Sequence, residues 1–138
     1  MNIEVSHEEN LEVFDALVSK LRQFNMNHMG DETSKPLSVI ATDDQGSLIG
    51  GVCGRTIYNQ LLIDIVWVDE SARQQGLGRR LMARAEHEAK SRGCVAAQVD
   101  TLSFQAPSFY QKLGFEVIGT VTDILNSPDR FFLVKKYR

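Results

Sequence analysis

Residues 61–68 constrain the fold most strongly, because they form a predicted strand that is apolar on both faces and interrupted only by Asp64. Such a strand is typical of the centre of a sheet. After a glycine-containing loop, apolar residues recur at three- and four-residue steps over residues 76–91, which predicts a helix. Its arginines and glutamates are expected to face outward. The inward stripe is expected to consist of Leu77, Leu81, Ala85 and Ala89.

The other segments indicate helices and strands in one sheet. An opening strand is expected at Ile3 and Val5, followed by a helix over residues 8–24 and a loop or a short irregular helix over residues 25–36. Two apolar runs flank a turn-rich stretch at residues 43–47, which predicts a hairpin. In 138 residues this order predicts one α/β or α+β domain, residues 1–138, with helices covering the sheet. The remaining expected elements are hairpin strands at residues 37–41 and 48–53, strands at 95–99, 115–118 and 131–134, and a helix at 104–113.

Charge and cysteine content exclude several classes of protein. Fifteen Lys and Arg against 18 Asp and Glu give a net charge of −3, so no nucleic-acid partner is expected, since that would need a basic face. Cys53 and Cys94 stand in no ligand pattern and the histidines are scattered, so no metal site is predicted. The N-terminus lacks the features of a signal peptide and no apolar run could span a bilayer, so a cytoplasmic protein without membrane contact is expected.

The junction between the apolar strand and the helix predicts a binding site for pyrophosphate. The first turn of a helix carries unpaired N–H groups and partial positive charge. Gly76 and Gly78 remove side chains from this turn, and Arg73, Arg79 and Arg80 surround it with positive charge. The spacing matches neither the nucleotide-triphosphate loop nor the dinucleotide fingerprint. A glycine turn that only packs the helix against the sheet is the structural alternative.

Two motifs resemble the GNAT superfamily of acyl-CoA-dependent N-acetyltransferases. Arg73-Gln74-Gln75-Gly76-Leu77-Gly78 matches the family pattern Arg/Gln-x-x-Gly-x-Gly/Ala. Residues 103–115 are similar to the family segment Asn-x-x-Ala-x-x-x-Tyr-x-x-x-Gly-Phe, with Ser103 in place of the Asn. The resemblance implies a mixed, mostly antiparallel central sheet flanked by helices. It also implies acetyl-CoA as co-substrate and no metal.

The resemblance assigns roles to individual residues. Tyr110 would be the general acid that protonates the departing thiolate, although a core aromatic is the structural alternative. Ser103 would face the pantetheine arm. The backbone of Val66, Trp67 and Val68 would line that arm and polarise the acetyl carbonyl. The pyrophosphate would be held by the backbone of Arg73, Gln74, Gln75, Gly76, Leu77, Gly78 and Arg79.

The general base and the acceptor are left open by these motifs. Asp64, which shares a strand face with Val66 by simple alternation, is the expected base, with Asp100 or a water as alternatives. Each aspartate also has a structural alternative as a hydrogen-bonded turn or cap residue. The expected reaction is direct attack of a primary amine, of a small molecule, on acetyl-CoA. The alternatives are a non-catalytic CoA-binding regulatory module and an acetyltransferase of protein lysines or N-termini. Pairing of residues 131–134 at a sheet edge would give a homodimer.

Overall fold

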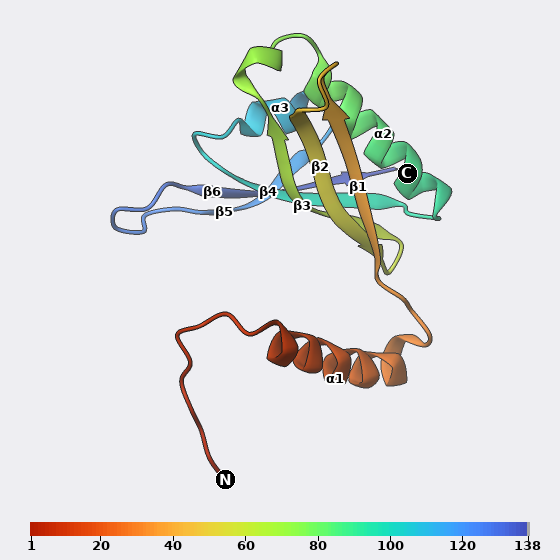
Figure 1. Cartoon of the computed structure of the whole chain (residues 1–138), viewed down its shortest axis with the longest axis vertical. Coiled ribbons are helices and arrows are strands. Elements are labelled where there is room, and N and C mark those ends of the chain that lie inside the picture. The colour runs from red at the N-terminus through yellow and green to blue at the C-terminus, as the bar shows by residue number, and fades with distance from the viewer. Residues whose placement is uncertain (138) are drawn as a thin grey trace. The chain divides into compact units, whose positions relative to one another are not determined.

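The computed structural model describes residues 1–137 and forms two compact units, the first being Met1–Thr33 and the second beginning at Ser34. The first unit contains one helix, α1 (Leu11–Met29), labelled in Figure 1. The Asn10 side chain caps its start by accepting a hydrogen bond from the N–H of Val13 at 3.1 Å. Gly30, with φ of 82°, ends it and donates its N–H to the carbonyl of Met26 at 3.0 Å.

One prediction for the first unit is wrong, because Ile3 and Val5 form no strand. For residues 25–36 a loop or a short irregular helix was expected. Residues 25–29 continue α1, because this polar segment contains no helix breaker before Gly30. The prediction of a helix in this part of the chain is confirmed.

The second unit is built on one six-stranded sheet in the order β1-β2-β3-β4-β6-β5 (Figure 1). All neighbouring strands are antiparallel except β3 and β4, which confirms the mixed, mostly antiparallel class. The strands are β1 (Lys35–Thr42), β2 (Leu48–Ile57), β3 (Gln60–Val68), β4 (Ala96–Leu102), β5 (Glu116–Val121) and β6 (Arg130–Lys136). The helices are the 3-10 turn η1 (Glu70–Ala72), α2 (Leu77–Ser91) and α3 (Pro107–Lys112).

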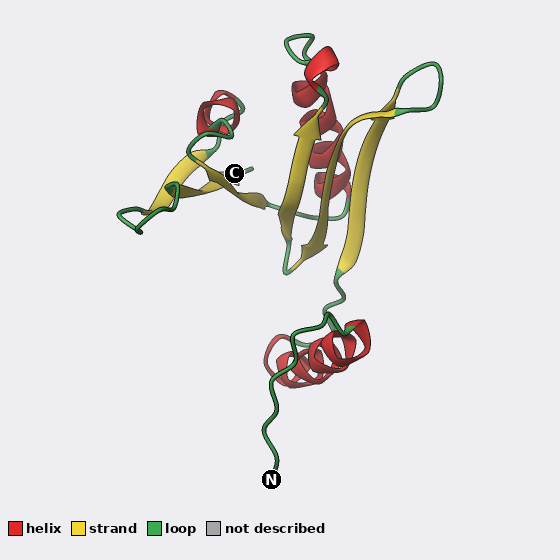
Figure 2. Cartoon of the chain, turned by 60° about the vertical axis from the view of Figure 1, so that its left-hand side comes forward, coloured by secondary structure: helices red, strands yellow, loops and turns green. Residues whose placement is uncertain are grey.

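The sheet parts between β3 and β4. Their parallel pairing runs only from Gln60 opposite Ala96 to Leu62 opposite Gln98. Beyond that point the two halves of the sheet diverge, as Figure 2 shows. The register of β2 and β3 shifts between Cys53 and Gly54, where β3 carries an extra residue. A Cβ on Gly54 would lie 2.2 Å from the carbonyl oxygen of Leu62, so only glycine fits at this bulge.

Helix α2 covers the half of the sheet formed by β1, β2 and β3. Met82, Ala85 and Ala89 are fully buried against strand residues such as Val52 and Leu61. The expected stripe is confirmed for Leu81, Ala85 and Ala89, whereas Leu77 is half-buried and Met82 was missed.

Glu86 contradicts the expectation that the glutamates of α2 face solvent. It is 6% exposed, and Lys135 of β6 places its Nζ 3.1 Å from Glu86 Oε1. The ammonium group offsets the cost of burying the carboxylate. The partner that allows this glutamate to be buried therefore comes from a residue far along the sequence.

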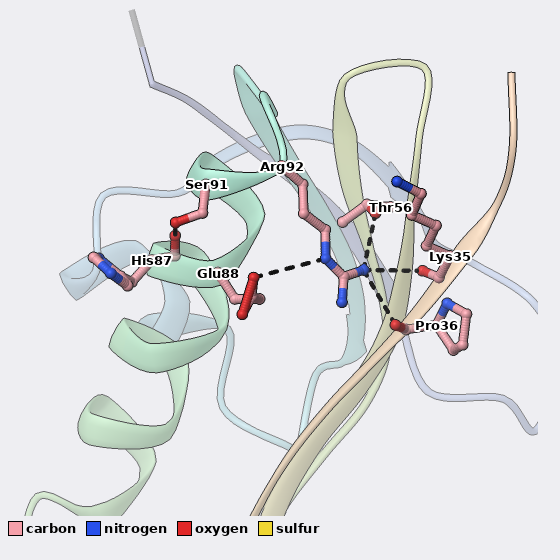
Figure 3. A network of polar contacts seen from close by, with 7 residues as sticks. All are labelled: Lys35, Pro36, Thr56, His87, Glu88, Ser91 and Arg92. Carbon is pink, nitrogen blue, oxygen red and sulfur yellow. Dashed lines mark hydrogen bonds and ion pairs between the residues drawn. The ribbon is translucent and has the colours of Figure 1, made fainter.

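The end of α2 is tied to the start of β1 by Arg92 (Figure 3). Its Nη1 donates to the carbonyl oxygens of Lys35 at 3.3 Å and Pro36 at 3.1 Å, and to Thr56 Oγ1 at 3.1 Å. These contacts bridge the helix to the strand pair β1–β2.

Strand β6 lies inside the sheet, between β4 and β5. Residues 131–134 are therefore not a free edge of the sheet, and the expectation that they pair there with a second copy is wrong. The hairpin formed by β5 and β6 places β5 at one edge of the sheet, and β1 forms the other.

Candidate active site

A cleft of about 880 Å³ opens where β3 and β4 part. The N-terminus of α2 lies along one side of it, and α3 with the loop before it lies along another. Eleven of the thirteen residues predicted for the site line this cleft: Asp64, Val66, Trp67, Val68, Arg73, Gln74, Gly76, Leu77, Gly78, Arg79 and Tyr110. Motifs separated by a strand and a helix in the sequence thus meet in one place.

The N-terminus of α2 forms the positively charged end of the cleft. Gly76 is its N-cap with φ of 76°, a left-handed conformation that favours glycine, and a Cβ there would meet nothing within 4 Å. Because glycine supplies no side chain to cap the helix, the first N–H groups of α2 are left for another partner. Arg73 donates its Nε to the carbonyl of Val68 at 3.0 Å, which holds its side chain beside this turn. The positive end of the helix dipole and the arginines favour an anion here.

The loop before α2 is held in place by Asp69. Its N–H donates to the carbonyl of Ile49 at 2.8 Å, which anchors the loop to β2. Its carboxylate accepts hydrogen bonds from the hydroxyl and the N–H of Ser71, and both lower the pKa of Asp69. The turn that leads to Gly76 is therefore fixed by local hydrogen bonds.

Gly78 lines the cleft and also contacts α3. A Cβ at this position would lie 3.1 Å from the ring of Phe109, so the missing side chain makes room for α3. Gly76 lies in an open turn, whereas Gly78 also serves packing between α2 and α3.

Gln75 and Ser103 are not among the residues that line the cleft. The side-chain amide of Gln75 donates to the carbonyl of Ser71 at 3.1 Å, so it is turned back toward η1. Ser103 is exposed, and its N–H donates to the carbonyl of Asp129 at 2.9 Å. The departure from the family pattern at this position thus falls at the margin of the site.

The edge of β3 that faces β4 lies open in the cleft. Val66 pairs with Val52, and Trp67 with Gly51, so the ladder to β2 uses one edge of the strand. The ladder to β4 ends at Leu62, so the other edge carries no ladder bonds from β4 beyond it. Backbone groups on this edge can bind an extended ligand as a neighbouring strand would.

Tyr110 lies on α3 at the inner wall of the cleft. It is 7% exposed and makes edge contacts with the rings of Phe109 at 5.1 Å and Phe115 at 5.8 Å between centroids. Burial, with a smaller effect from the charge of Asp100, raises the pKa of Tyr110 to about 12. The phenol therefore stays protonated at neutral pH and can donate a proton, which suits an acid and not a base.

The two candidate bases have different surroundings. Asp64 lies at the bulge of β3, so simple alternation with Val66 does not hold, although both residues line the cleft. Its carboxylate is 4.0 Å from the guanidinium of Arg55, and both side chains are about half exposed. Asp100, at the end of β4, accepts a hydrogen bond from Arg130 of β6.

Several residues of the site were missed in the sequence. Gln105 accepts hydrogen bonds from the N–H of Leu102 at 2.8 Å and from Thr101 Oγ1 at 3.3 Å, which shapes the loop before α3. Lys112 also lines the cleft. Arg130 pairs with Asp100, which is another lining residue. The position of Gln105 and Lys112 inside the second motif was the available indication.

Comparison with known proteins gives the family. The model of the Acetyltransferase (GNAT) family matches residues 5–115. The chain is 41% identical over 107 residues to blasticidin-S acetyltransferase of Streptomyces morookaense, covering 75% of this chain and 79% of that protein. A crystal structure described as an acetyltransferase from Agrobacterium tumefaciens is 30% identical, with a TM-score of 0.90 and 99% of both chains covered. A structure described as a streptothricin acetyltransferase from Bacillus anthracis str. Ames, in complex with acetyl coenzyme A, is 25% identical, with a TM-score of 0.66 and coverage of 75% of this chain and 64% of that one.

The chain belongs to the GNAT family and is an acetyltransferase. Within residues 1–137 there is no cluster of three or more His, Cys, Asp or Glu side chains suited to a metal ion. In the same part of the chain, each helix is too short or too polar to cross a membrane.

Proposed function

We propose that the protein transfers an acetyl group from acetyl-CoA to a primary amine of a small molecule by direct attack. One observation carries the proposal: the uncapped N-terminus of α2, the open edge of β3 and the buried Tyr110 line the same cleft. These are an anion site, a surface for an extended chain and a proton donor. An acyl donor with a pyrophosphate and a long arm needs all three.

The proposed donor site follows from charge and shape. The first N–H groups of α2, with Arg73 and Arg79, would hold the pyrophosphate of the donor. The open edge of β3 from Val66 to Val68 would hydrogen-bond the arm and orient the acetyl carbonyl. The absence of a Cβ at Gly76 keeps the backbone within reach of the phosphates.

In the proposed reaction the departing sulfur gains one proton and the amine nitrogen loses one. The amine nitrogen attacks the acetyl carbon, a C–N bond forms and the C–S bond breaks. Tyr110 would donate its proton to the sulfur, and the nitrogen would lose a proton to Asp64 or to a water beside it. Tyr110 then regains a proton from solvent.

Asp64 is the proposed base in preference to Asp100. Its distance of 4.0 Å from Arg55 is that of a loose surface pair, and its side chain is 55% exposed at the cleft. The Asp100 carboxylate already accepts the guanidinium of Arg130. A carboxylate oxygen that already accepts a guanidinium N–H has fewer lone pairs free to accept from an amine.

The proposed acceptor is a small-molecule amine of the kind that antibiotic acetyltransferases modify. The support comes from likeness to one protein named for blasticidin S and another for streptothricin. Blasticidin S and streptothricin are therefore the first acceptors to test.

The test is release of CoA, followed with a thiol reagent, in a panel of amines. The panel contains blasticidin S, streptothricin, spermidine and a lysine peptide. Tyr110→Phe should lose most turnover with the best acceptor, while Tyr58→Phe, at the β2–β3 turn outside the cleft, should keep it. Release with the peptide alone would favour a protein acetyltransferase. Donor binding without release from any amine would favour a regulatory module.

A further inference from the structure

An ion pair joins the two strands behind Tyr110. Asp100 of β4 is paired in register with Phe132 of β6, so Arg130 is its diagonal neighbour two residues along β6. Arg130 donates Nη1 to Asp100 Oδ2. The side chains of Arg130 and Asp100 are 46% and 37% exposed, so both still contact solvent.

Asp100 faces the same cleft as Tyr110, and its charge acts on the phenol. Both residues line the cleft. The Asp100 charge is the second cause, after burial, of the raised pKa of Tyr110. A negative charge at this place therefore opposes any further negative charge near the hydroxyl.

The proposed reaction creates such a charge. As the C–S bond breaks, negative charge develops on the sulfur until Tyr110 protonates it. A carboxylate without a partner in the same cleft would raise the energy of that state. A guanidinium bound to the carboxylate offsets the repulsion.

We propose that Arg130 is a positioning residue for acyl transfer, acting through Asp100 to offset part of its charge in the cleft that Tyr110 and the departing sulfur share. The inference rests on the proposed function. It assigns Asp100 no part in removing the proton from the amine. It also gives a purpose to an arginine that lies outside both family motifs.

The test is a double-mutant cycle on the full chain with the best acceptor from the panel. Kinetic constants for acetyl-CoA and the melting temperature are measured for Arg130→Met, Asp100→Asn, the double variant and Arg130→Lys. Arg84→Met, on the exposed face of α2, is the matched control. Arg130→Gln serves as a second variant if the methionine variant folds poorly.

Arg130→Met should lower kcat roughly tenfold, less than the 10²- to 10³-fold loss typical for a direct oxyanion donor, because the pair is half exposed. KM for acetyl-CoA should change less than about twofold, because the pyrophosphate site is untouched. Asp100→Asn should restore most of the lost turnover in the Arg130→Met background. Arg130→Lys and Arg84→Met should resemble the wild type.

Each contrary result has a definite meaning. Wild-type kcat in Arg130→Met, or no recovery in the double variant, overturns the inference while the proposed function stands. Loss of turnover in Asp100→Asn alone overturns it too, because Asp100 would then be the base. If the wild-type protein releases no CoA with any amine, the proposed function fails and the inference fails with it.

Discussion

Replacing Arg92 by methionine is expected to lower the free energy of unfolding by about 2–3 kcal/mol. The guanidinium bridges the end of α2 to Lys35, Pro36 and Thr56 (Figure 3). All three acceptors approach one nitrogen, Nη1, which carries two protons, so two good bonds are the upper limit. Each hydrogen bond to a charged group contributes about 1.5 kcal/mol at the lower end of its range. Methionine keeps the packing of the aliphatic stem, so the change reports mainly the lost polar contacts.

The remaining contact of Arg92 is weak and supplies the control. Its Nε lies 3.9 Å from Glu88 Oε2, an i,i+4 pair in which the carboxylate is half exposed. Such a pair is worth about 0.3–0.5 kcal/mol. Glu88→Gln should therefore change the free energy of unfolding by less than about 0.5 kcal/mol.

The assay is equilibrium unfolding in urea, followed by circular dichroism. With a slope of about 1–3 kcal/mol/M, Arg92→Met should lower the midpoint by about 0.7–3 M without changing the slope. The buried Thr56, 5% exposed, tests the hydrogen bond to its hydroxyl. Thr56→Val should lower the free energy of unfolding less in the Arg92→Met background than in the wild type. Equal midpoints for Arg92→Met and Glu88→Gln would refute the reasoning, and additive effects of Arg92→Met and Thr56→Val would refute the part that concerns the hydroxyl.

Four further outcomes are expected. Gly76→Ala should weaken binding of CoA, measured by calorimetry, and cost about 1–2 kcal/mol of stability, because alanine is strained at φ of 76° even though open space surrounds it. Tyr110→Phe should lower kcat about 10²- to 10⁴-fold. Because the pKa of Tyr110 is raised to about 12, its deprotonation should produce no fall in the wild-type rate between pH 7 and pH 10. Gly54→Ala should lower the melting temperature by several degrees, because its Cβ would lie 2.2 Å from the Leu62 carbonyl oxygen and overpacking costs about 1–3 kcal/mol. Burial and Glu86 raise the pKa of Tyr137, so the contribution of Tyr137 to the free energy of unfolding should be constant up to the ordinary tyrosine pKa of about 10 and decrease above it, and the loss of stability above pH 10 should be smaller in Tyr137→Phe.

The elements that the sequence predicts correctly are those with strong local patterns. The helix that became α2 and the hairpin of β1 and β2 were expected within a few residues of their bounds, since apolar spacing and a turn determine them locally. The residues predicted for the site likewise make up half of those that line the cleft. For residues 25–29 the sequence left loop and short helix open, because a polar segment without a breaker is compatible with both, and in the structure α1 continues to Met29.

Errors in the site come from contacts between segments far apart in the sequence. The bulge that displaces Asp64 arises where Gly54 of β2 opposes β3, and no pattern within β3 reveals it. The burial of Glu86 depends on Lys135, and the pairing of Asp100 depends on Arg130. Predicting these contacts requires the order of the strands in the sheet, in which β6 lies beside β4 and not at an edge.

The same parting of the sheet would let one cleft serve both the proposed donor binding and the proposed chemistry. A continuous parallel ladder between β3 and β4 would use the edge of β3 and bring α2 and α3 against a closed surface. The bulge at Gly54 redirects β3 just after its pairing with β4 ends at Leu62. The edge of β3 then opens beside the N-terminus of α2, and Tyr110 reaches the gap from the opposite half of the sheet. A backbone irregularity in β2 and β3 therefore creates the space in which the donor, the proposed acid and the acceptor amine would meet.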